Sequence, residues 1–431
     1  MARRAALTAS KPVIADATSR LNASVSELQE VHRLVSDASR LAQQGIQALS
    51  PAERSALATE AEGVLDRLKN VANTKFGQHY LFGGTRSGDQ PFQFSEPSVA
   101  GRLSVTSYGG GLTNSQSVIS PELAVDSLYN GNLIFDEAGR QPTILHSKTG
   151  ITTSTGTDTM TGRAKLQVRH VLTQYATGSG VVAAANSPGN DTILGKLAAH
   201  KLTIKDTSGT GAFGTVSLNN GNEIAFDSSM SSLEVTGPGG EKVFIDTSGI
   251  TAGFTGDVNI TADGTLSVDG GKTTTAIDFT ASQTITDSLS GKTVRLNTLA
   301  LGRTGDDWLE FPGTTDVFET LDSLIRDLRG DRPIDSGALN ASLGRTLSRL
   351  EQLGDRVLET IGIQSSSLAG LEQVQYRNED LLFELEAEQS GLQSTDLARA
   401  IIDLQSEQLM QQYTYAVTSR IMSQSLLNFL S

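Results

Sequence analysis

Two Gly-Lys-Thr triplets are the residues in this chain that come nearest to a known chemical site. They are Gly271-Lys-Thr273 and Gly291-Lys-Thr293. A phosphate-binding loop has a further glycine five positions before the second one, so that backbone N–H groups can surround a phosphate. Leu266 and Thr286 hold those positions here, and both triplets lie between predicted strands rather than before a helix. We therefore interpret the triplets as turns and predict no nucleotide site.

The histidines and aspartates predict no metal site. A zinc-protease pattern needs two histidines one helical turn apart, but the histidines are scattered along the chain: His32, His79, His146, His170 and His200. We expect His32 to pack or be solvated on a helical seam. Asp263 and Asp269 lack the twelve-residue spacing of a calcium loop and are better explained as Asp-Gly turns. No metal or cofactor is expected.

A nucleophilic site has no support either. The chain has no cysteine, which excludes a thiol nucleophile, a disulfide framework and a cysteine-based metal site. No Gly-x-Ser-x-Gly element presents a serine. We predict that the protein is not an enzyme.

Charge and hydropathy exclude two further classes of partner. The 431 residues carry a formal net charge of −14, and acidic and basic residues are interspersed. A nucleic-acid protein needs a basic patch, so nucleic acid is not an expected partner. The sequence has no run of about 20 apolar residues, the length that a membrane-spanning helix needs, so a membrane is not an expected partner. The basic start lacks the apolar stretch of a signal peptide and meets Lys11-Pro12, so export would use no cleaved signal.

Composition divides the chain into three regions. Residues 13–75 and 315–431 have helical patterns, whereas residues 95–312 are rich in Gly, Thr, Ser, Asp and Val. Helix, sheet and helix in this order imply that the two ends pack together while the middle protrudes. The predicted class is α+β, a long-helix coiled-coil bundle from both chain ends with an inserted, sandwich-like antiparallel β domain.

Two helices are expected in the first region. The first has apolar residues at alternating spacings of four and three, with His32 and Ser39 as polar interruptions. These apolar residues are Leu21, Val25, Leu28, Val35, Ala42, Ile46 and Leu49. Ser50, Pro51 and Glu53 form a capping-box start for the second, whose seam is Leu57, Ala61, Val64, Leu68 and Val71. The Ser-Pro corner allows the helices either to stack end to end or to fold back.

The middle region predicts short strands at roughly ten-residue intervals, as in a small antiparallel sandwich or barrel. Asn219-Asn-Gly-Asn222 and Gly237-Pro-Gly-Gly240 each lie between two apolar alternating segments and predict hairpins. Ala262-Asp-Gly264 and Asp269-Gly-Gly271 are expected to be turns between further strands. Residues 101–190 predict only weak strands.

The third region predicts a short helix and a long one. Thr315 or Asp316 caps the short helix, which ends at Gly330-Asp-Arg-Pro333. The long helix starts near Ser336 and holds a heptad seam of Leu343, Leu347, Leu350, Val357, Ile361, Leu368 and Leu371. A softer Ser390-Gly391 precedes a terminal helix.

The terminal helix carries an apolar stripe with no partner segment beside it in sequence. It has no Gly or Pro from Leu397 to Leu430, and Gln408 and Gln411 are polar members of its heptad register. A stripe left for another molecule to cover indicates assembly. The predicted assembly residues are Leu397, Ile401, Leu404, Tyr415, Met422, Leu426, Phe429 and Leu430.

One segment resembles a known family. Asn70-Val-Ala-Asn-Thr-Lys-Phe-Gly-Gln-His-Tyr-Leu-Phe-Gly-Gly-Thr85 resembles the segment that closes the helical bundle in flagellin-like hook-associated proteins, specifically the hook–filament junction kind. Gly77 is expected to end the helix. The bundle-closing turn is Tyr80, Leu81, Phe82, Gly83 and Gly84, in which the first three begin a strand and the glycines turn the chain outward. The linker at residues 49–57 and the segments 397–404 and 423–430 are also similar to this family.

The resemblance implies a structural adapter that joins the flagellar hook to the filament by helix packing between subunits. It implies the following partners: copies of itself in a ring, a neighbouring hook-associated protein, flagellin and a cytoplasmic export chaperone. The location would be extracellular, on the flagellum. The expected divisions are 1–94 and 313–390 for the bundle, 95–312 for the inserted β region and 391–431 for the terminal assembly helix.

Family members start with a helical segment that pairs with the C-terminal helix and carries the export signal. This chain has Met1-Ala-Arg-Arg at that place, which implies either a start codon further upstream or a truncated protein. Three alternatives remain: a filament flagellin, a surface β-adhesin held by coiled coils and, more remotely, an enzyme acting on surface glycans.

Overall fold

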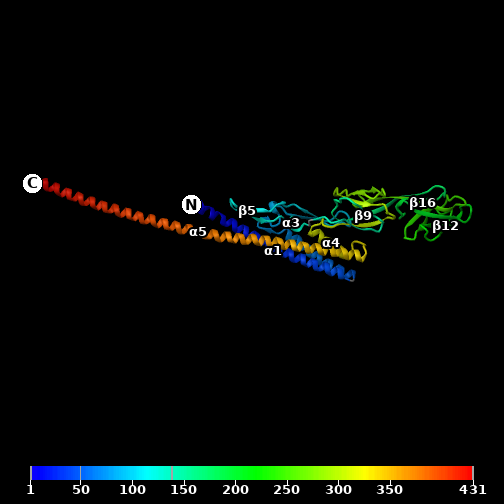
Figure 1. Ribbon diagram of the computed structural model, residues 1–431, viewed down its shortest axis with the longest axis horizontal. Coiled ribbons are helices and arrows are strands. Elements are labelled where there is room, and N and C mark those ends of the chain that lie inside the picture. Colours follow the sequence, from blue (N-terminus) through cyan, green and yellow to red (C-terminus); the bar gives the residue numbers. More distant parts are fainter. Residues whose placement is uncertain (1, 49, 137–138, 430–431) are drawn as a thin grey trace. The chain divides into compact units, whose positions relative to one another are not determined.

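The computed structural model has helices from both ends of the chain and strands between them (Figure 1). It describes residues 2–48, 50–136 and 139–429, without the side chains of residues 2, 393 and 423–429. The predicted α+β class is confirmed. The chain divides into two compact units: Met1–Val25 with Asn114–Leu128 and Gly362–Ser431, and Ser26–Thr113 with Tyr129–Ile361. We call these the terminal unit and the main unit.

Helix α1 (Ala2–Gln47) begins earlier than the sequence predicts, because it runs through Pro12. Proline removes one helical N–H donor, but seam residues on both sides of it are buried, among them Ser10 and Ile14. In a long helix, packing of one face outweighs a single lost hydrogen bond.

Helix α2 (Pro51–Ala72) starts at the predicted capping box and folds back along α1. Glu53 N donates to Ser50 Oγ at 3.2 Å, and Ser50 N donates to the Glu53 carboxylate at 2.9 Å. At the far end of α2, Thr74 is hydrogen-bonded to Glu27 of α1. The corner at Ser50 is therefore a reversal, which settles the choice that the sequence left open.

Helices α4 (Val317–Arg329) and α5 (Ser336–Phe429) complete the helical part. Asp316 caps α4, and Gly330 ends it with a φ of 77°. In the main unit, Gly45 of α1 lies against Leu328 of α4 and near Leu343 of α5, so the two chain ends pack together as predicted. Helix α5 continues through Ser390-Gly391 without a break.

One antiparallel sheet dominates the inserted region. Its strand order is β13-β12-β11-β16-β9-β20-β7, with β17 added beside β16. The strands are β7 (Ile144–His146), β9 (Gly162–Tyr175), β11 (Gly195–Asp206), β12 (Phe213–Leu218), β13 (Ile224–Asp227), β16 (Thr255–Ser267), β17 (Thr275–Ala276) and β20 (Gly305–Phe311).

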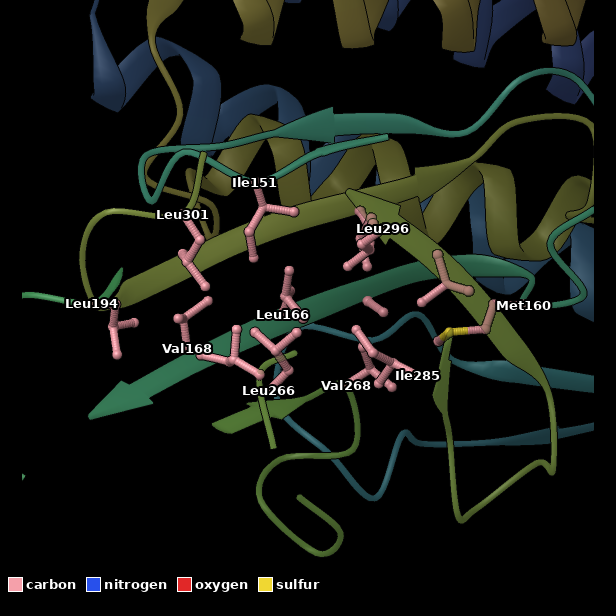
Figure 2. Close-up of a cluster of buried hydrophobic side chains, with 14 of the residues drawn as sticks. Ile151, Met160, Leu166, Val168, Leu194, Leu266, Val268, Ile285, Leu296 and Leu301 are labelled. Carbon is pink, nitrogen blue, oxygen red and sulfur yellow. The ribbon is translucent and has the colours of Figure 1, made fainter. Parts of the chain in front are cut away.

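Two three-stranded sheets cover this sheet and enclose two apolar cores. The first core, drawn in Figure 2, combines Leu166 and Leu266 of the large sheet with Ile285 and Leu296. The second combines Leu202 and Ile260 with residues of the other small sheet. The covering strands are β8 (Thr152–Thr153), β18 (Gln283–Thr286) and β19 (Thr293–Asn297) in one sheet, and β10 (Val182–Ala183), β14 (Leu233–Thr236) and β15 (Lys242–Asp246) in the other.

Both predicted hairpins are present, but one predicted turn is wrong. Strands β12 and β13 pair across Asn219 and Asn220, which both have positive φ, and β14 pairs with β15. At Ala262-Asp-Gly264, by contrast, β16 continues, and the opposite strand β9 carries an extra residue, Val171. A Cβ on Gly264 would lie 2.5 Å from the Arg169 carbonyl oxygen, so this glycine permits a close strand approach at a bulge.

Small elements complete the two units. The hairpin of β5 (Ser115–Ser120) and β6 (Leu123–Leu128) belongs to the terminal unit, although it lies within the predicted β insertion. The main unit also holds β1 (Lys75–Phe76), β2 (His79–Tyr80), β3 (Phe92–Ser95), β4 (Val105–Tyr108), the 3-10 turn η1 (Gly84–Arg86) and helix α3 (Gly131–Phe135). None of the helices that the structure describes combines the length and the hydropathy that a membrane span requires.

Candidate functional site

The predicted assembly stripe is uncovered. Leu397, Ile401, Leu404, Tyr415 and Met422 are all exposed, with Ile401 the least exposed at 47% and Tyr415 the most at 71%. The side chains of Leu426 and Phe429, and Leu430 as a whole, lie outside the described residues.

The stripe carries no charge. In the heptad register of Leu397 and Ile401, its remaining positions hold Gln408, Gln411 and Thr418. The charged residues of this segment fall at other positions: Asp396, Arg399, Asp403, Glu407 and Arg420. A partner that covered this face would therefore leave no charge buried.

Sequence reasoning missed a second exposed set on α5. At 100° per residue, Ile402, Leu409, Tyr413 and Val417 lie on the side of the helix opposite the stripe. They are 53–70% exposed. These residues are spaced four or seven positions apart, which is itself a helical apolar pattern in the sequence. A search for one heptad seam does not detect it, because the pattern lies on a second face.

The predicted bundle-closing turn ties three chain segments of the main unit together. Phe82 O accepts hydrogen bonds from Gly131 N at 3.0 Å and Tyr108 Oη at 2.9 Å. Gly83 O accepts from Gly111 N, and Gly84 N donates to Tyr129 O. The glycines thus hold the turn against neighbouring backbone rather than directing the chain outward.

Two details of the predicted turn are wrong. Helix α2 ends at Ala72 with Asn73 as its cap, and Gly77, with a φ of +61°, lies in the short turn between β1 and β2. The strand β2 includes Tyr80 but not Leu81 or Phe82. Both of these side chains are fully buried instead, because they anchor the turn in the core.

Phe82 belongs to an aromatic cluster that connects the turn to helix α4. Its ring meets Phe135 edge-on at 5.4 Å, and Phe135 in turn contacts Phe92 at 5.3 Å and Phe318 of α4 at 5.7 Å. The first two of these pairs are edge-to-face, and such pairs add about 0.5–1.5 kcal/mol beyond area burial. The cluster therefore fixes the turn to the bundle by packing.

A buried ionic network connects the large sheet to α4 and α5. Arg163 of β9 donates to both carboxylate oxygens of Asp327 on α4, at 2.8 and 2.7 Å. Arg332 pairs with Asp327 and also with Glu310 of β20. Ser342 of α5 donates to Asp327 at 2.7 Å. No local sequence pattern signals this network, because Arg163 lies far from Asp327 and Ser342 along the chain.

The network keeps its carboxylates ionised despite burial. Burial alone would raise the pKa of Glu310, but the hydrogen bond with His146 and the charges of Arg163, Arg332 and Arg345 hold that pKa well below its usual range. Asp327 behaves in the same way, since Arg163 and Arg332 lower its pKa against the effect of burial. This arrangement suits a rigid joint between the sheet and the bundle.

A cavity of about 360 Å³ lies beside this joint in the main unit. Asp316 and Glu319, at the start of α4, line it together with Arg102, Lys292 and Asp287. Burial raises the pKa of Asp316 to about 6. Burial and the charge of Asp316 raise the pKa of Glu319 to about 8. Burial therefore favours the protonated form of both carboxyl groups.

The remaining candidate residues are placed in structural roles. Neither Gly-Lys-Thr triplet precedes a helix: the first lies between β16 and β17, and the second leads into β19, whose first residue is Thr293. The fully buried His170 ring contacts Thr173 Oγ1 at 2.8 Å, and that hydroxyl donates to Asp191 at 2.5 Å. Within the described residues, no group of three His, Asp or Glu side chains could hold a metal ion.

No family model and no curated protein matches the chain. Among solved structures, FlgL of Xanthomonas campestris is 16% identical with a TM-score of 0.45, covering 88% of this chain and 99% of its own. Flagellar hook associated protein-3 of Legionella pneumophila is 18% identical with a TM-score of 0.39, covering 91% and 95%. FliC of Burkholderia pseudomallei is 11% identical with a TM-score of 0.24, covering 83% and 99%. The alignments with these three solved structures cover most of this chain, at identities below 20% and TM-scores below 0.5.

Proposed function

We propose that this protein is a structural subunit of the bacterial flagellum that joins the hook to the filament. Copies of the chain form a ring by helix packing, contacting a hook-associated protein on one side and flagellin on the other. The ring is extracellular, and the inserted β region faces solvent. The proposal combines the resemblance of residues 70–85 with the geometry of α5.

The uncharged, exposed stripe of α5 is the observation that carries the proposal. Five large apolar side chains between Leu397 and Met422 are each at least 47% exposed. An exposed apolar surface of this kind favours association. We infer that neighbouring subunits cover the stripe after assembly, and that a cytoplasmic chaperone covers it before export.

The buried joint suits a mechanical role. An adapter transmits torque, which requires that its sheet and helices do not move independently within one subunit. Arg163, Asp327 and Glu310 connect the large sheet to α4 and α5 through buried charge-assisted hydrogen bonds, and such bonds are the stronger kind.

A test compares two triple variants of the full chain in the bacterium that encodes it. Leu397→Ser, Ile401→Ser and Leu404→Ser remove the apolar stripe. Asp396→Ser, Arg399→Ser and Asp403→Ser change the same helix turns on the other faces and serve as the matched control. We expect the first variant to lose attached filaments in electron micrographs and to lose motility, while the control retains both. Normal filaments in the stripe variant would refute the proposal.

Purified protein separates the proposal from its alternatives. A filament flagellin polymerises alone, whereas we expect that this protein does not polymerise when it is purified. Light scattering of the isolated chain after seeding measures this. A surface adhesin predicts normal motility in a deletion strain, and that result would replace the proposal.

A further inference from the structure

Two polar layers interrupt the apolar seam between α1 and α5 in the terminal unit. On α1 they hold Ser10 and Ser24, which are 7% and 1% exposed. On α5 they hold Asn378, half-buried, and Gln364, fully buried. The sequence pattern placed Val25 on this seam, but the structure buries its polar neighbour Ser24 there.

The two layers are matched in spacing. Ser10 and Ser24 are two heptads apart, and so are Gln364 and Asn378. The helices are antiparallel, since Arg4 pairs with Glu386 and Lys11 with Glu379. Asn378 Nδ2 donates to Ser10 Oγ at 3.1 Å. Moving two heptads along both helices from this contact brings Ser24 to the level of Gln364.

The second layer is costly for stability. Neither the Gln364 amide nor the Ser24 hydroxyl has a hydrogen-bond partner among the described residues. Each buried polar group left in this state costs about 1–3 kcal/mol. Leucine at these positions would pack the seam without that cost, so stability does not account for the layers.

We propose that the two layers specify the register in which α1 pairs with α5. A shift of one heptad in one direction sets Ser10 and Ser24 at the levels of Leu385 and Leu371. A shift in the other direction sets Ser10 at the level of Leu371 and Gln364 at the level of Ala17. Each shift buries polar groups against apolar ones, and a buried polar residue at a seam position is an established way to fix register.

Disulfide trapping tests the register directly, because the chain contains no cysteine of its own. Lys11→Cys is combined with Glu379→Cys to report the observed register. The same Lys11→Cys is combined with Glu372→Cys or Glu386→Cys to report a shift of one heptad either way. In the otherwise native chain we expect the 11–379 bridge to form at least tenfold faster than the other two.

The variant Gln364→Leu with Asn378→Leu then replaces both polar residues of α5. We expect unchanged helix content, an equal or higher melting temperature and bridges to positions 372 or 386 at rates within a few-fold of the 11–379 bridge. Leu371→Ile with Leu385→Ile is the matched control and should keep the native preference. A double leucine variant that retains the tenfold preference would overturn the proposal. So would one that melts lower or fails to fold, because the layers would then contribute stability.

Discussion

Arg163 and Asp327 form a bidentate pair in which both guanidinium Nη atoms donate to separate carboxylate oxygens, at 2.8 and 2.7 Å. Their side chains are 7% and 0% exposed. The pair links β9 to α4, and its two residues are 164 positions apart in the sequence. The connection between the inserted sheet and the bundle therefore depends on a buried pair of opposite charges.

Replacing Arg163 by methionine should destabilise the main unit by about 3–5 kcal/mol, because it removes one of two arginine partners from a buried carboxylate. Urea unfolding followed by the fluorescence of Trp308 on β20 measures the change. Arg169→Met on the same strand is the control. Its pair with Asp306 is half exposed on the arginine side, and such pairs contribute about 0–1 kcal/mol. Equal losses in the two variants would contradict the assigned role of burial.

Gly84→Ala should be much more harmful than Gly77→Ala. Both glycines have a left-handed backbone, with φ of +54° and +61°, which costs alanine about 1 kcal/mol. A Cβ at Gly84 would also lie 2.6 Å from the Gly111 and Thr113 carbonyl oxygens, whereas nothing lies within 4 Å at Gly77. We expect a further loss of about 2 kcal/mol from this overlap. Thermal unfolding of the two variants gives the comparison.

Local signals in the sequence were enough to place several elements. The capping box at Ser50 and Glu53 and the Asn219-Asn turn depend on neighbouring residues alone, and the structure has both. Asp263-Gly264 was assigned wrongly because the same dipeptide suits a turn and a bulge, and only the partner strand decides between them. The Arg163 network could not be predicted from one sequence, because its members are brought together by the fold.

In the candidate site, too, one feature could be predicted from local sequence and another could not. Heptad spacing in the sequence predicts that Leu397 and Ile401 share one face, and their exposure shows that the described chain leaves that face uncovered. The residues that cover this face belong to no segment of the described chain, so the heptad pattern of one sequence predicts the face but not its partner. The second exposed set, which includes Tyr413, was missed for a different reason. It falls on the face that a one-seam pattern assigns to solvent.

Phe135→Ala should cost about 3–5 kcal/mol, as large-to-small changes of buried aromatic residues do. Its ring contacts Phe82, Phe92 and Phe318, and it is 1% exposed. Phe213→Ala removes an aromatic side chain that is 56% exposed and should cost less than about 1 kcal/mol. Differential scanning calorimetry separates the two. A small effect of Phe135→Ala would mean that the bundle-closing turn is held by its backbone hydrogen bonds alone.

The Glu319 carboxyl should make the main unit lose stability as pH rises. Its pKa is raised from 4.5 to about 8 by burial and by Asp316, with Lys292 acting weakly in the opposite direction. Since the folded state binds this proton more tightly than the unfolded chain, its contribution is fully present below pH 4.5 and is lost as pH rises through 8. Asp316, whose pKa is raised to about 6, adds to the same trend at lower pH. The other charged groups that face the pair across the cavity are Arg102, Asp136 and Asp287.

Glu319→Gln keeps the shape of that side chain and removes its titration. We expect the free energy of unfolding of the native chain to fall between pH 5 and pH 8.5 relative to this variant, with the two curves closest at pH 5. His170 contributes with the opposite sign, because burial lowers its pKa and its contribution is lost as pH falls below 6.5. It is present in both proteins, so it cancels in the difference. Glu351→Gln, an exposed site on α5, is the control. A difference between native and Glu319→Gln that stays constant over this range would show that Glu319 is ionised throughout.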